Sequence, residues 1–440
     1  FSSAVKWWEE GAEKFPDSAD LFNLLGAAYL QTDQVEPAAK AIKKSLALRP
    51  DDLKTLSNYG VLLLRQNKLD KAAELYRKLV TLDPKAAEFH NNLGQILLSQ
   101  GHLEEAGKAL QNTLSLNPRH ANATLGIATV LKAEHRNDEA LRAFRQALAL
   151  NPAMEKSWFA LASHLEFMSG LEEAEKIIGD ALRRFPASLA LPIVRARILR
   201  RQKKHAEALS YMESLLPALR HQPQRSGEFY REIAQLYDKA GRYDYAFRYF
   251  FEANKLDKTA SEEKAVDTNE LPKKIAQCRK TFTKDFVESY APVAVRNIQG
   301  GMPKPVFMVG FPRSGTTLLH RLLASHPAIS VTEEEQIVPE LARRIGADYP
   351  KGLESLDSNA VADLRQTFFD LHKRRGSNLK KPILIDRLPF SMIDAGLINR
   401  IFPEAKFILA LRHPFDCVMS AWMQDFAPNA ATVHFYDLAE

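Results

Sequence analysis

The chain has 440 residues, of which 45% are hydrophobic and 26% charged, and its formal net charge is +6. This length is too great for one hydrophobic core, so we expect two or more domains, and the mildly basic balance favours anionic ligands without requiring nucleic acid. No apolar run reaches membrane-spanning length, and the two cysteines, Cys278 and Cys417, show neither disulfide nor metal-ligand spacing, so we expect no membrane span and a cytoplasmic location.

A 34-residue period runs through the first half of the chain. Each unit carries a large–small pair on its first helix, such as Tyr59-Gly60, and a small residue early in its second, such as Ala72. Small residues let two antiparallel helices approach closely, and a proline closes each unit. The prolines are Pro16, Pro50, Pro84, Pro118, Pro152 and Pro186. This pattern resembles the tetratricopeptide repeat, so we expect an α-helical solenoid over residues 1–257 whose first repeat is incomplete.

Asparagines recur on the first helices of successive repeats. Asn58 and Asn92 occupy equivalent positions, and Asn23 and Asn91 lie near them. These side chains could line an inner groove and hold an extended peptide, or they could be polar residues on a wetted surface. Both interpretations remain open at the level of the sequence.

Residues 258–304 are expected to join the two halves of the chain. The segment begins with the charged run Ser261-Glu262-Glu263-Lys264, which is typical of a linker. From Leu271 to Tyr290, apolar residues then follow a helical spacing, which predicts a helix that docks the solenoid onto the following domain. A short insertion around His221-Gln222-Pro223 precedes the last repeat.

From Pro305 onward, short apolar runs alternate with amphipathic segments. This alternation predicts an α/β domain with a parallel sheet over residues 305–440. The expected strands are 306–309, 382–385 and 407–411, and the expected helices are 316–325, 337–345, 357–374, 390–401 and 414–426. Ligands of such sheets bind beyond the carboxyl ends of the strands.

The first of these strands leads into a glycine-bounded loop and a helix. Backbone N–H groups at the start of a helix are unpaired and the helix dipole is positive there, so the loop is a candidate site for phosphate or sulfate. Gly310 and Gly315 have the glycine spacing of a Walker A loop, but Thr316 stands at the lysine position and the basic residue is Arg313. Thr317 supplies a second hydroxyl.

Charged residues follow two further strands. Arg412 leaves the strand 407–411, and Ser420 lies two turns into the next helix, so a guanidinium and a hydroxyl can reach one anion. Arg387 follows the strand 382–385, and the acidic cluster Glu333-Glu334-Glu335 comes after the first helix of the domain. Three strand ends thus bring cations and carboxylates to one edge of the predicted sheet.

Two of these segments resemble sulfotransferases. PVFMVGFPRSGTTLL is similar to their 5′-phosphosulfate-binding loop, and FILALRHPFDCVMSAW to their 3′-phosphate-binding strand and helix. PRSGTT followed by SHPAISVTEEE, and DRLPF before FPEAKF, are most similar to tyrosylprotein sulfotransferases and to bacterial sulfotransferases with tetratricopeptide repeats. The chain is therefore identified as resembling a tetratricopeptide-repeat sulfotransferase.

The resemblance implies transfer of a sulfuryl group from 3′-phosphoadenosine 5′-phosphosulfate to an acceptor hydroxyl, with protein tyrosine as one candidate, and without a metal. Glu334 would be the base, although Glu333 and Glu335 remain open. Arg313 and Arg387 would be the other catalytic residues, and Arg387 stands where tyrosylprotein enzymes have the lysine that stabilises the leaving group. The acceptor, a protein, peptide or glycan, would bind through the repeat groove. The implied donor-binding residues are Arg313, Ser314, Gly315, Thr316, Thr317, Arg412 and Ser420.

Sulfotransferases of this kind continue well beyond the position of Glu440, so we expect the C-terminal domain to be truncated. Two alternatives stand beside the sulfotransferase. One is a non-catalytic repeat scaffold with a degenerate nucleotide-binding fold. The other is a nucleotide kinase or hydrolase, which the missing Walker lysine and the missing Mg²⁺-binding carboxylate disfavour.

Overall fold

The computed structural model describes residues 2–219, 227–263, 266–289, 302–426 and 429–438. Contacts divide the chain into two compact units. The first consists of Phe1–His221 and Lys239–Gly241, and the second of Gln222–Asp238 and Arg242–Glu440. The last repeat therefore groups with the C-terminal half.

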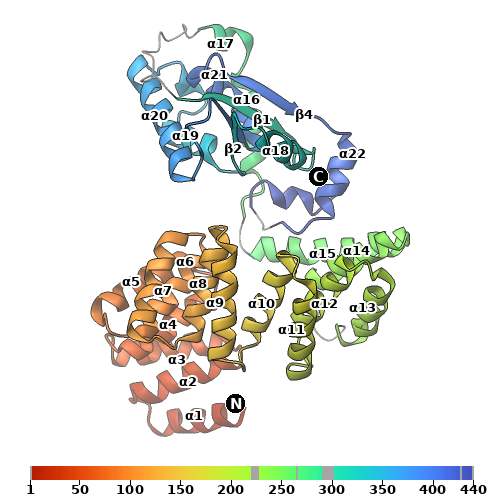
Figure 1. The fold of residues 1–440 in the computed structure, drawn as a ribbon. Helices are drawn as coiled ribbons and strands as arrows, with labels where there is room; N and C mark the ends of the chain where they lie inside the picture. The colour runs from red at the N-terminus through yellow and green to blue at the C-terminus, as the bar shows by residue number, and fades with distance from the viewer. Residues whose placement is uncertain (1, 220–226, 264–265, 290–301, 427–428, 439–440) are drawn as a thin grey trace. The chain divides into compact units, whose positions relative to one another are not determined.

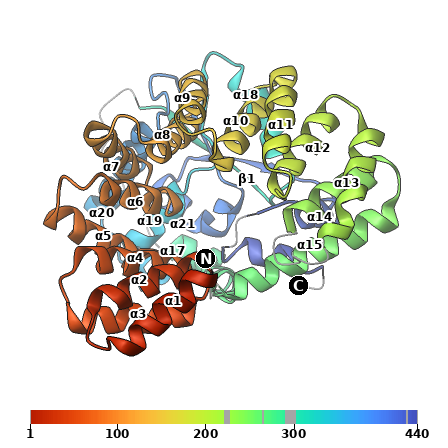
Figure 2. The same cartoon turned by 90° about the horizontal axis from the view of Figure 1, so that it is seen from below.

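The first unit is a series of antiparallel helix pairs (Figure 1). Its helices are α1 (Ser2–Lys14), α2 (Ala19–Gln31), α3 (Val35–Leu48), α4 (Leu53–Arg65), α5 (Leu69–Leu82), α6 (Ala87–Ser99), α7 (Leu103–Leu116), α8 (Ala121–Ala133), α9 (Asn137–Leu150), α10 (Glu155–Phe167), α11 (Leu171–Arg184), α12 (Ala190–Arg201) and α13 (His205–Leu219). Successive helices follow one another along an open arc (Figure 2). The predicted helical solenoid is confirmed.

Small residues at equivalent positions bring the helices of each pair together. Alanines early in the second helices are fully buried, which lets the large residues of the facing helix fill the space between repeats. They are Ala38, Ala72, Ala106, Ala140 and Ala174, each 0% exposed. Helices α12 and α13 continue the stack. The insertion around His221-Gln222-Pro223 lies outside the described residues.

The second unit begins with four helices, α14 (Gly227–Lys239), α15 (Tyr243–Glu263), α16 (Glu270–Thr281) and α17 (Lys284–Ser289). Two of them differ from the sequence prediction. The charged segment from Ser261 to Glu263 continues α15 because no helix-breaking residue precedes it. A single helix was expected from Leu271 to Tyr290, but α16 ends at Thr281 and a separate helix, α17, begins at Lys284. Tyr290 itself lies outside the described residues.

A four-stranded parallel sheet forms the centre of the described part of this unit, in the order β2-β3-β1-β4. Its strands are β1 (Lys304–Gly310), β2 (Ile329–Val331), β3 (Ile383–Arg387) and β4 (Lys406–Ala410). Around it lie α18 (Thr316–Ala324), α19 (Ile337–Ile345), η2 (Lys351–Leu353), α20 (Ser358–Arg374), η3 (Pro389–Asp394), α21 (Ala395–Ile401), α22 (Pro414–Trp422) and η4 (Thr432–Phe435). The predicted α/β domain with a parallel sheet is confirmed.

The sheet brings the predicted site residues to one edge. In the register, Gly310 of β1 pairs with Ala410 of β4, and Met308 pairs with Arg387 of β3, so all three strands end side by side. β1 and helices α19 to α21 share one apolar core that includes Phe307, Phe368 and Phe402. None of the helices in the described part of the chain combines the length and apolarity that a bilayer crossing needs.

Candidate functional site

The loop after β1 depends on glycine at both of its ends. A Cβ atom on Gly310 would lie 2.7 Å from the carbonyl oxygen of Ala410 and 2.8 Å from Ser314 Oγ. Gly315, which precedes the first turn of α18, has φ of +102°, a conformation that side chains strongly disfavour. The two glycines therefore allow the chain to turn back tightly between strand and helix.

Arg313 has an unusual backbone conformation that neighbouring groups hold in place. Its φ is +70°, which is uncommon for a residue other than glycine. Its carbonyl oxygen accepts a hydrogen bond from Arg412 Nη1 at 3.2 Å, and its Nε donates to Ser420 Oγ at 3.0 Å. The structure thus brings Arg313 together with two residues that lie 99 and 107 positions further along the chain.

The start of α18 offers several donors to an anion. The first N–H groups of a helix have no partner within the helix, and the helix dipole is positive at this end. Ser314 and Thr316 are buried, at 8% and 4% exposed. Ser314 Oγ has no hydrogen-bond partner among the described residues. Because buried hydroxyls are nearly always hydrogen-bonded, this free hydroxyl fits a ligand that supplies the partner.

Arg387 and two glutamates form the second part of the site. The Arg387 side chain is 5% exposed, and its Nη1 donates to Glu334 Oε1 at 2.7 Å while its Nη2 donates to Glu333 Oε2 at 2.6 Å. Nη1 also lies 3.5 Å from Thr317 Oγ1. One guanidinium group therefore connects the acidic cluster to the helix that follows the loop after β1.

The three neighbouring glutamates differ in their surroundings. Glu334 lines the cavity above the loop, whereas Glu335 pairs with Arg375 at 3.5 Å. Glu333 lies between Arg387 and His320, whose Nε2 is 3.9 Å from Glu333 Oε1. Burial lowers the pKa of His320, and the cations Arg387 and Arg321 add to this effect while Glu333 opposes it.

The sequence analysis missed His320. The available signal was its spacing, since His320 lies one turn after Thr317 on the same side of α18. A histidine next to an acidic cluster is not recognisable as such until the fold brings α18 and the segment after β2 together.

A cavity of about 460 Å³ unites the loop with the acidic cluster. The predicted residues on its wall are Arg313, Gly315, Thr316, Thr317, Glu334 and Arg412. A second cavity of about 1240 Å³ adjoins it, and Phe390, Ala431 and Phe435 line both. The larger cavity is mostly apolar, with Ile275 and Met419 among its lining residues. The described residues include no cluster of three or more His, Cys, Asp or Glu side chains that could hold a metal ion.

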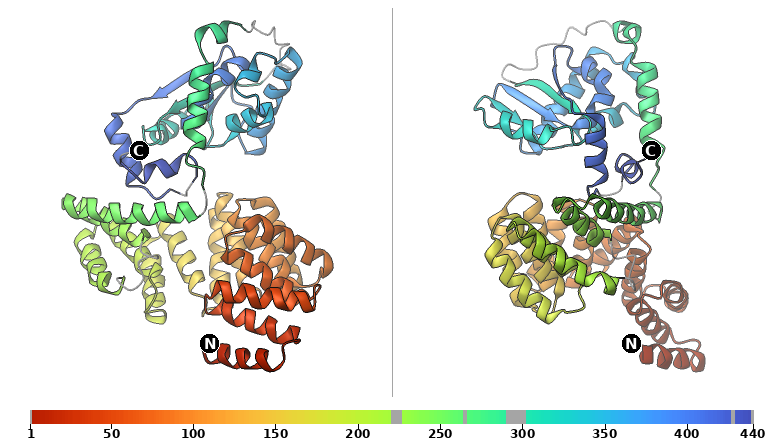
Figure 3. Two further views of the ribbon diagram at one scale, coloured as in Figure 1. Left: turned by 180° about the vertical axis from the view of Figure 1, so that it is seen from behind. Right: turned by 90° about the vertical axis from the view of Figure 1, so that its right-hand side faces the viewer.

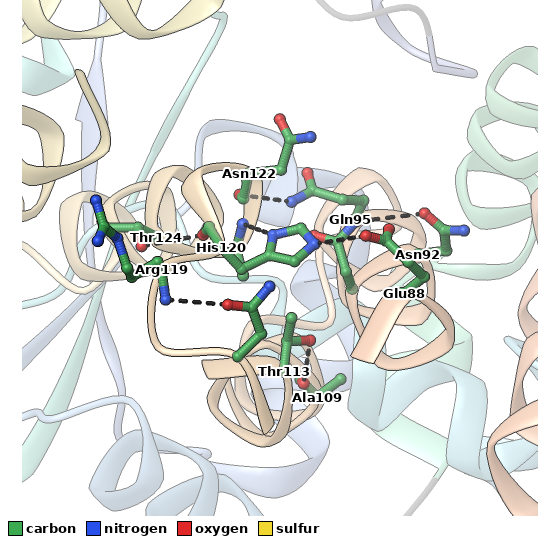
Figure 4. Close-up of polar contacts among 12 residues, drawn as sticks. Glu88, Asn92, Gln95, Ala109, Thr113, Arg119, His120, Asn122 and Thr124 are labelled. Carbon is green, nitrogen blue, oxygen red and sulfur yellow. Dashed lines mark hydrogen bonds and ion pairs between the residues drawn. The ribbon is translucent and has the colours of Figure 1, made fainter. Parts of the chain in front are cut away.

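The asparagines of the solenoid contact one another and neighbouring side chains. Asn58 Nδ2 donates to Asn23 Oδ1 at 2.7 Å, and Asn92 Nδ2 donates to the Tyr76 hydroxyl at 3.2 Å. Figure 4 shows Asn92 near the side chain of Glu88, whose Oε1 lies 3.1 Å from His120 Nε2. Asn92 Oδ1 also accepts a hydrogen bond from Asn91 Nδ2 at 3.3 Å. Each carboxamide has two N–H donors and a carbonyl oxygen, so Asn58 and Asn92 keep further capacity to bind.

Models of known protein families match segments in both halves of the chain. Residues 305–440 match the model of the sulfotransferase family. Residues 19–52 and four overlapping segments between 58 and 223 match tetratricopeptide-repeat models.

Several curated proteins are similar over part of the chain. An uncharacterised protein of Aquifex aeolicus is 28% identical over 61% of this chain and 35% of its own length. Protein-tyrosine sulfotransferase 1 of Homo sapiens is 30% identical over 24% of this chain and 30% of its own length. Nodulation protein NoeE of Sinorhizobium fredii is 30% identical over 27% and 31%, respectively. The chain thus spans about a third of the length of these relatives.

Solved repeat structures are also similar to part of the chain. A thermophilic tetratricopeptide-repeat protein of Thermus thermophilus is 24% identical with a TM-score of 0.39, covering 41% of this chain and 99% of that one. A repeat protein of Parabacteroides merdae is 18% identical with a TM-score of 0.44, covering 57% and 93%.

Proposed function

We propose that this chain, which carries tetratricopeptide repeats followed by a domain of the sulfotransferase family, transfers a sulfuryl group from 3′-phosphoadenosine 5′-phosphosulfate to an acceptor hydroxyl. One observation carries the proposal. The cavity at the carboxyl edge of the sheet is lined both by an anion-binding helix start with Arg313 and Arg412 and by the carboxylate of Glu334.

The two ends of the donor would bind to different parts of the loop region. The N–H groups at the start of α18, the free Ser314 hydroxyl and Arg313 suit the 5′-phosphosulfate. Arg412 and Ser420, which both contact Arg313, suit the 3′-phosphate. The hydrogen bond between Arg313 and Ser420 keeps these two parts at a fixed distance.

The acceptor hydroxyl would lose its proton to Glu334. The acceptor oxygen then forms the new bond to sulfur, and the bond between sulfur and the phosphate oxygen breaks. Adenosine 3′,5′-bisphosphate leaves with the electron pair of that bond. Charge on the departing phosphate needs fixed donors, which Arg313 and the helix start supply. Arg387 holds Glu334 at 2.7 Å and orients it towards the cavity.

We further propose an aromatic hydroxyl, such as a tyrosine of a protein or peptide, as the acceptor. The apolar cavity next to the donor pocket suits an aromatic ring, because Phe390 and Phe435 lie on the boundary between the two cavities. The polar surface of the solenoid would bind the rest of the acceptor protein, peptide or glycan. The cytoplasmic location stays a prediction.

Calorimetry with adenosine 3′,5′-bisphosphate and with ATP tests the proposal. We expect the bisphosphate to bind at least tenfold more tightly, because the loop lacks the lysine that holds the β and γ phosphates of ATP. Arg412→Ala is the matched variant and should weaken the bisphosphate more than ATP. Tighter binding of ATP would contradict a sulfotransferase, and binding of neither nucleotide would favour the non-catalytic repeat scaffold.

Sulfate transfer from a donor with a labelled sulfuryl group tests which class of acceptor the protein uses. Incubation with a cell lysate, followed by separation of protein and glycan fractions, should place the label on protein. Label on glycan alone would contradict the tyrosine acceptor while leaving sulfuryl transfer intact.

A further inference from the structure

The last repeat helix, α15, is joined to the helix that carries Ser420. Asn254 of α15 donates from Nδ2 to the carbonyl oxygen of Trp422 at 2.9 Å. Asn254 is 1% exposed and Trp422 is 2% exposed, so the bond is shielded from water. Trp422 is the last residue of α22, where carbonyl groups lack partners within the helix. Figure 3 shows α15 next to the C-terminal segment in both views.

A buried arginine fixes the orientation of the Asn254 amide. Arg231 of α14 is 3% exposed, and its Nη1 donates to Asn254 Oδ1 at 3.0 Å. Its Nη2 pairs with Asp257, which lies on α15 with Asn254. Because the guanidinium donates to the amide oxygen, the amide nitrogen must face Trp422. The network therefore has one arrangement.

Aromatic packing strengthens the same junction. The Trp422 ring lies 5.0 Å from the ring of Phe247 and 5.8 Å from that of Phe250, measured between centroids. Both phenylalanines belong to α15. A second polar contact, between Lys258 Nζ and Asp437 Oδ2 at 3.2 Å, joins α15 to the segment after α22.

The junction lies close to the donor pocket along the chain. Ser420 comes two residues before Trp422 in α22 and accepts the hydrogen bond from Arg313 Nε at 3.0 Å. A helix moves as a rigid element, so a shift of its last turn also shifts Ser420. A displacement of about 1 Å is enough to lose such a bond.

We propose that Asn254 is a positioning residue for the donor site, which holds the end of α22 so that Ser420 stays against Arg313. The inference rests on the proposed function of that site. The last repeat helix pair would then hold the donor site in place and would be more than a spacer between the solenoid and the α/β domain.

The variant Asn254→Asp tests this role. It keeps the size of the side chain and the contact with Arg231, but it replaces the donor that faces Trp422 with an acceptor. We expect the affinity for adenosine 3′,5′-bisphosphate, measured by calorimetry on the full chain, to fall about tenfold, as for the loss of about 1.4 kcal/mol. The KM for the acceptor should stay unchanged, and so should binding by the control Tyr243→Ala, an exposed position on the same helix.

A double-mutant cycle with Ser420→Ala separates positioning from general destabilisation. If Asn254 acts through Ser420, then Asn254→Asp should change affinity by less than twofold once Ser420 is alanine. Additive losses would overturn the proposal. If wild-type protein does not bind the bisphosphate, the proposed function fails; if it binds and Asn254→Asp binds equally well, only the positioning role fails.

A second variant covers the case in which Asn254→Asp does not fold. Phe247→Leu alters the packing against Trp422 at a position that is 48% exposed, so the fold should tolerate it. We expect a loss of bisphosphate affinity of about twofold to fivefold, as for part of an aromatic pair worth about 0.5–1.5 kcal/mol. Unchanged affinity in this folded variant would also overturn the proposal.

Discussion

The solenoid and the loop between β1 and α18 both need glycine, but for different reasons. In the solenoid, a Cβ on Gly60 would lie 2.5 Å from the ring of Tyr76, and one on Gly94 would lie 2.6 Å from a side-chain carbon of Leu110. In the loop, a Cβ on Gly310 would meet the backbone oxygen of Ala410. Side chains can move or be replaced, whereas the backbone of a sheet cannot. The repeats can therefore vary in sequence in a way that the loop cannot.

Two buried serines, one in the solenoid and one in the loop, differ in whether their hydroxyl groups are paired. Ser45, between repeats, is 0% exposed and its Oγ donates to the carbonyl oxygen of Ala19 at 2.8 Å. Ser314 in the loop is also buried, at 8% exposed, but its Oγ lacks a partner among the described residues. A paired hydroxyl contributes to stability, and an unpaired one is free for a ligand.

The largest expected effect is on catalysis and comes from Glu334, the carboxylate on the wall of the cavity above the loop among the described residues. We expect Glu334→Gln to lower kcat by about 10²- to 10⁴-fold, the usual contribution of a general base, with bisphosphate affinity unchanged. The matched control is Glu335→Gln, which should stay within a few fold because Glu335 faces Arg375. Full activity of Glu334→Gln in a sulfation assay would place the base elsewhere.

Paired glycine substitutions test the comparison directly. Gly310→Ala should weaken bisphosphate binding by up to about a hundredfold, since relief of such a clash costs about 1–3 kcal/mol and moves the loop. Gly60→Ala should lower the free energy of unfolding of the solenoid by a similar amount and leave nucleotide affinity unaltered. Calorimetry and thermal unfolding measure the two quantities. The comparison would be wrong if both variants lost binding equally.

Serine substitutions should separate stability from binding. Ser45→Ala leaves the Ala19 carbonyl group without this donor, so we expect a loss of about 1–3 kcal/mol in unfolding free energy. Ser314→Ala removes a hydroxyl that has no partner among the described residues, so its stability should change little while bisphosphate affinity falls about fivefold to tenfold. A strongly destabilised Ser314→Ala protein would show that this hydroxyl has a structural role.

The smallest expected effect concerns the polar surface of the repeats. Asn58→Ala removes one partly exposed hydrogen bond to Asn23, so peptide-acceptor KM should rise only about twofold, at the low end of 0.5–1.5 kcal/mol. Donor affinity should not change. Steady-state kinetics with a tyrosine peptide measure both values, and an unchanged acceptor KM would favour the interpretation of these asparagines as a merely wetted surface.

Most of the fold could be predicted because its signals are periodic. The 34-residue repeat and the alternation of strands and helices are visible in the sequence, and the helix 337–345 was predicted with its observed bounds. The strand β2 was missed because its three residues carry no period of their own. The helix expected over 390–401 begins as the 3-10 helix η3 because Pro389 starts it with a tighter turn.

The site could be predicted in composition but not in pairing. Residues at strand ends meet at one edge of a parallel sheet, so the approach of Arg313, Arg387 and Arg412 followed from topology. Which glutamate faces the cavity depends on side-chain directions in an irregular segment, and no sequence rule provides these. Asn254 was missed for a further reason, since its partner Trp422 is 168 residues away and the contact is with a backbone oxygen.

The fork of Arg387 has a consequence for charge during the reaction. With Glu333 and Glu334 both ionised, one positive and two negative groups leave the cluster with a net charge of −1. In the proposed mechanism, the proton from the acceptor converts Glu334 to its neutral form and brings the cluster to zero. Negative charge then grows on the departing phosphate as it disappears from the wall of the cavity. The proton transfer itself would therefore lower the electrostatic repulsion that the transferred group must overcome.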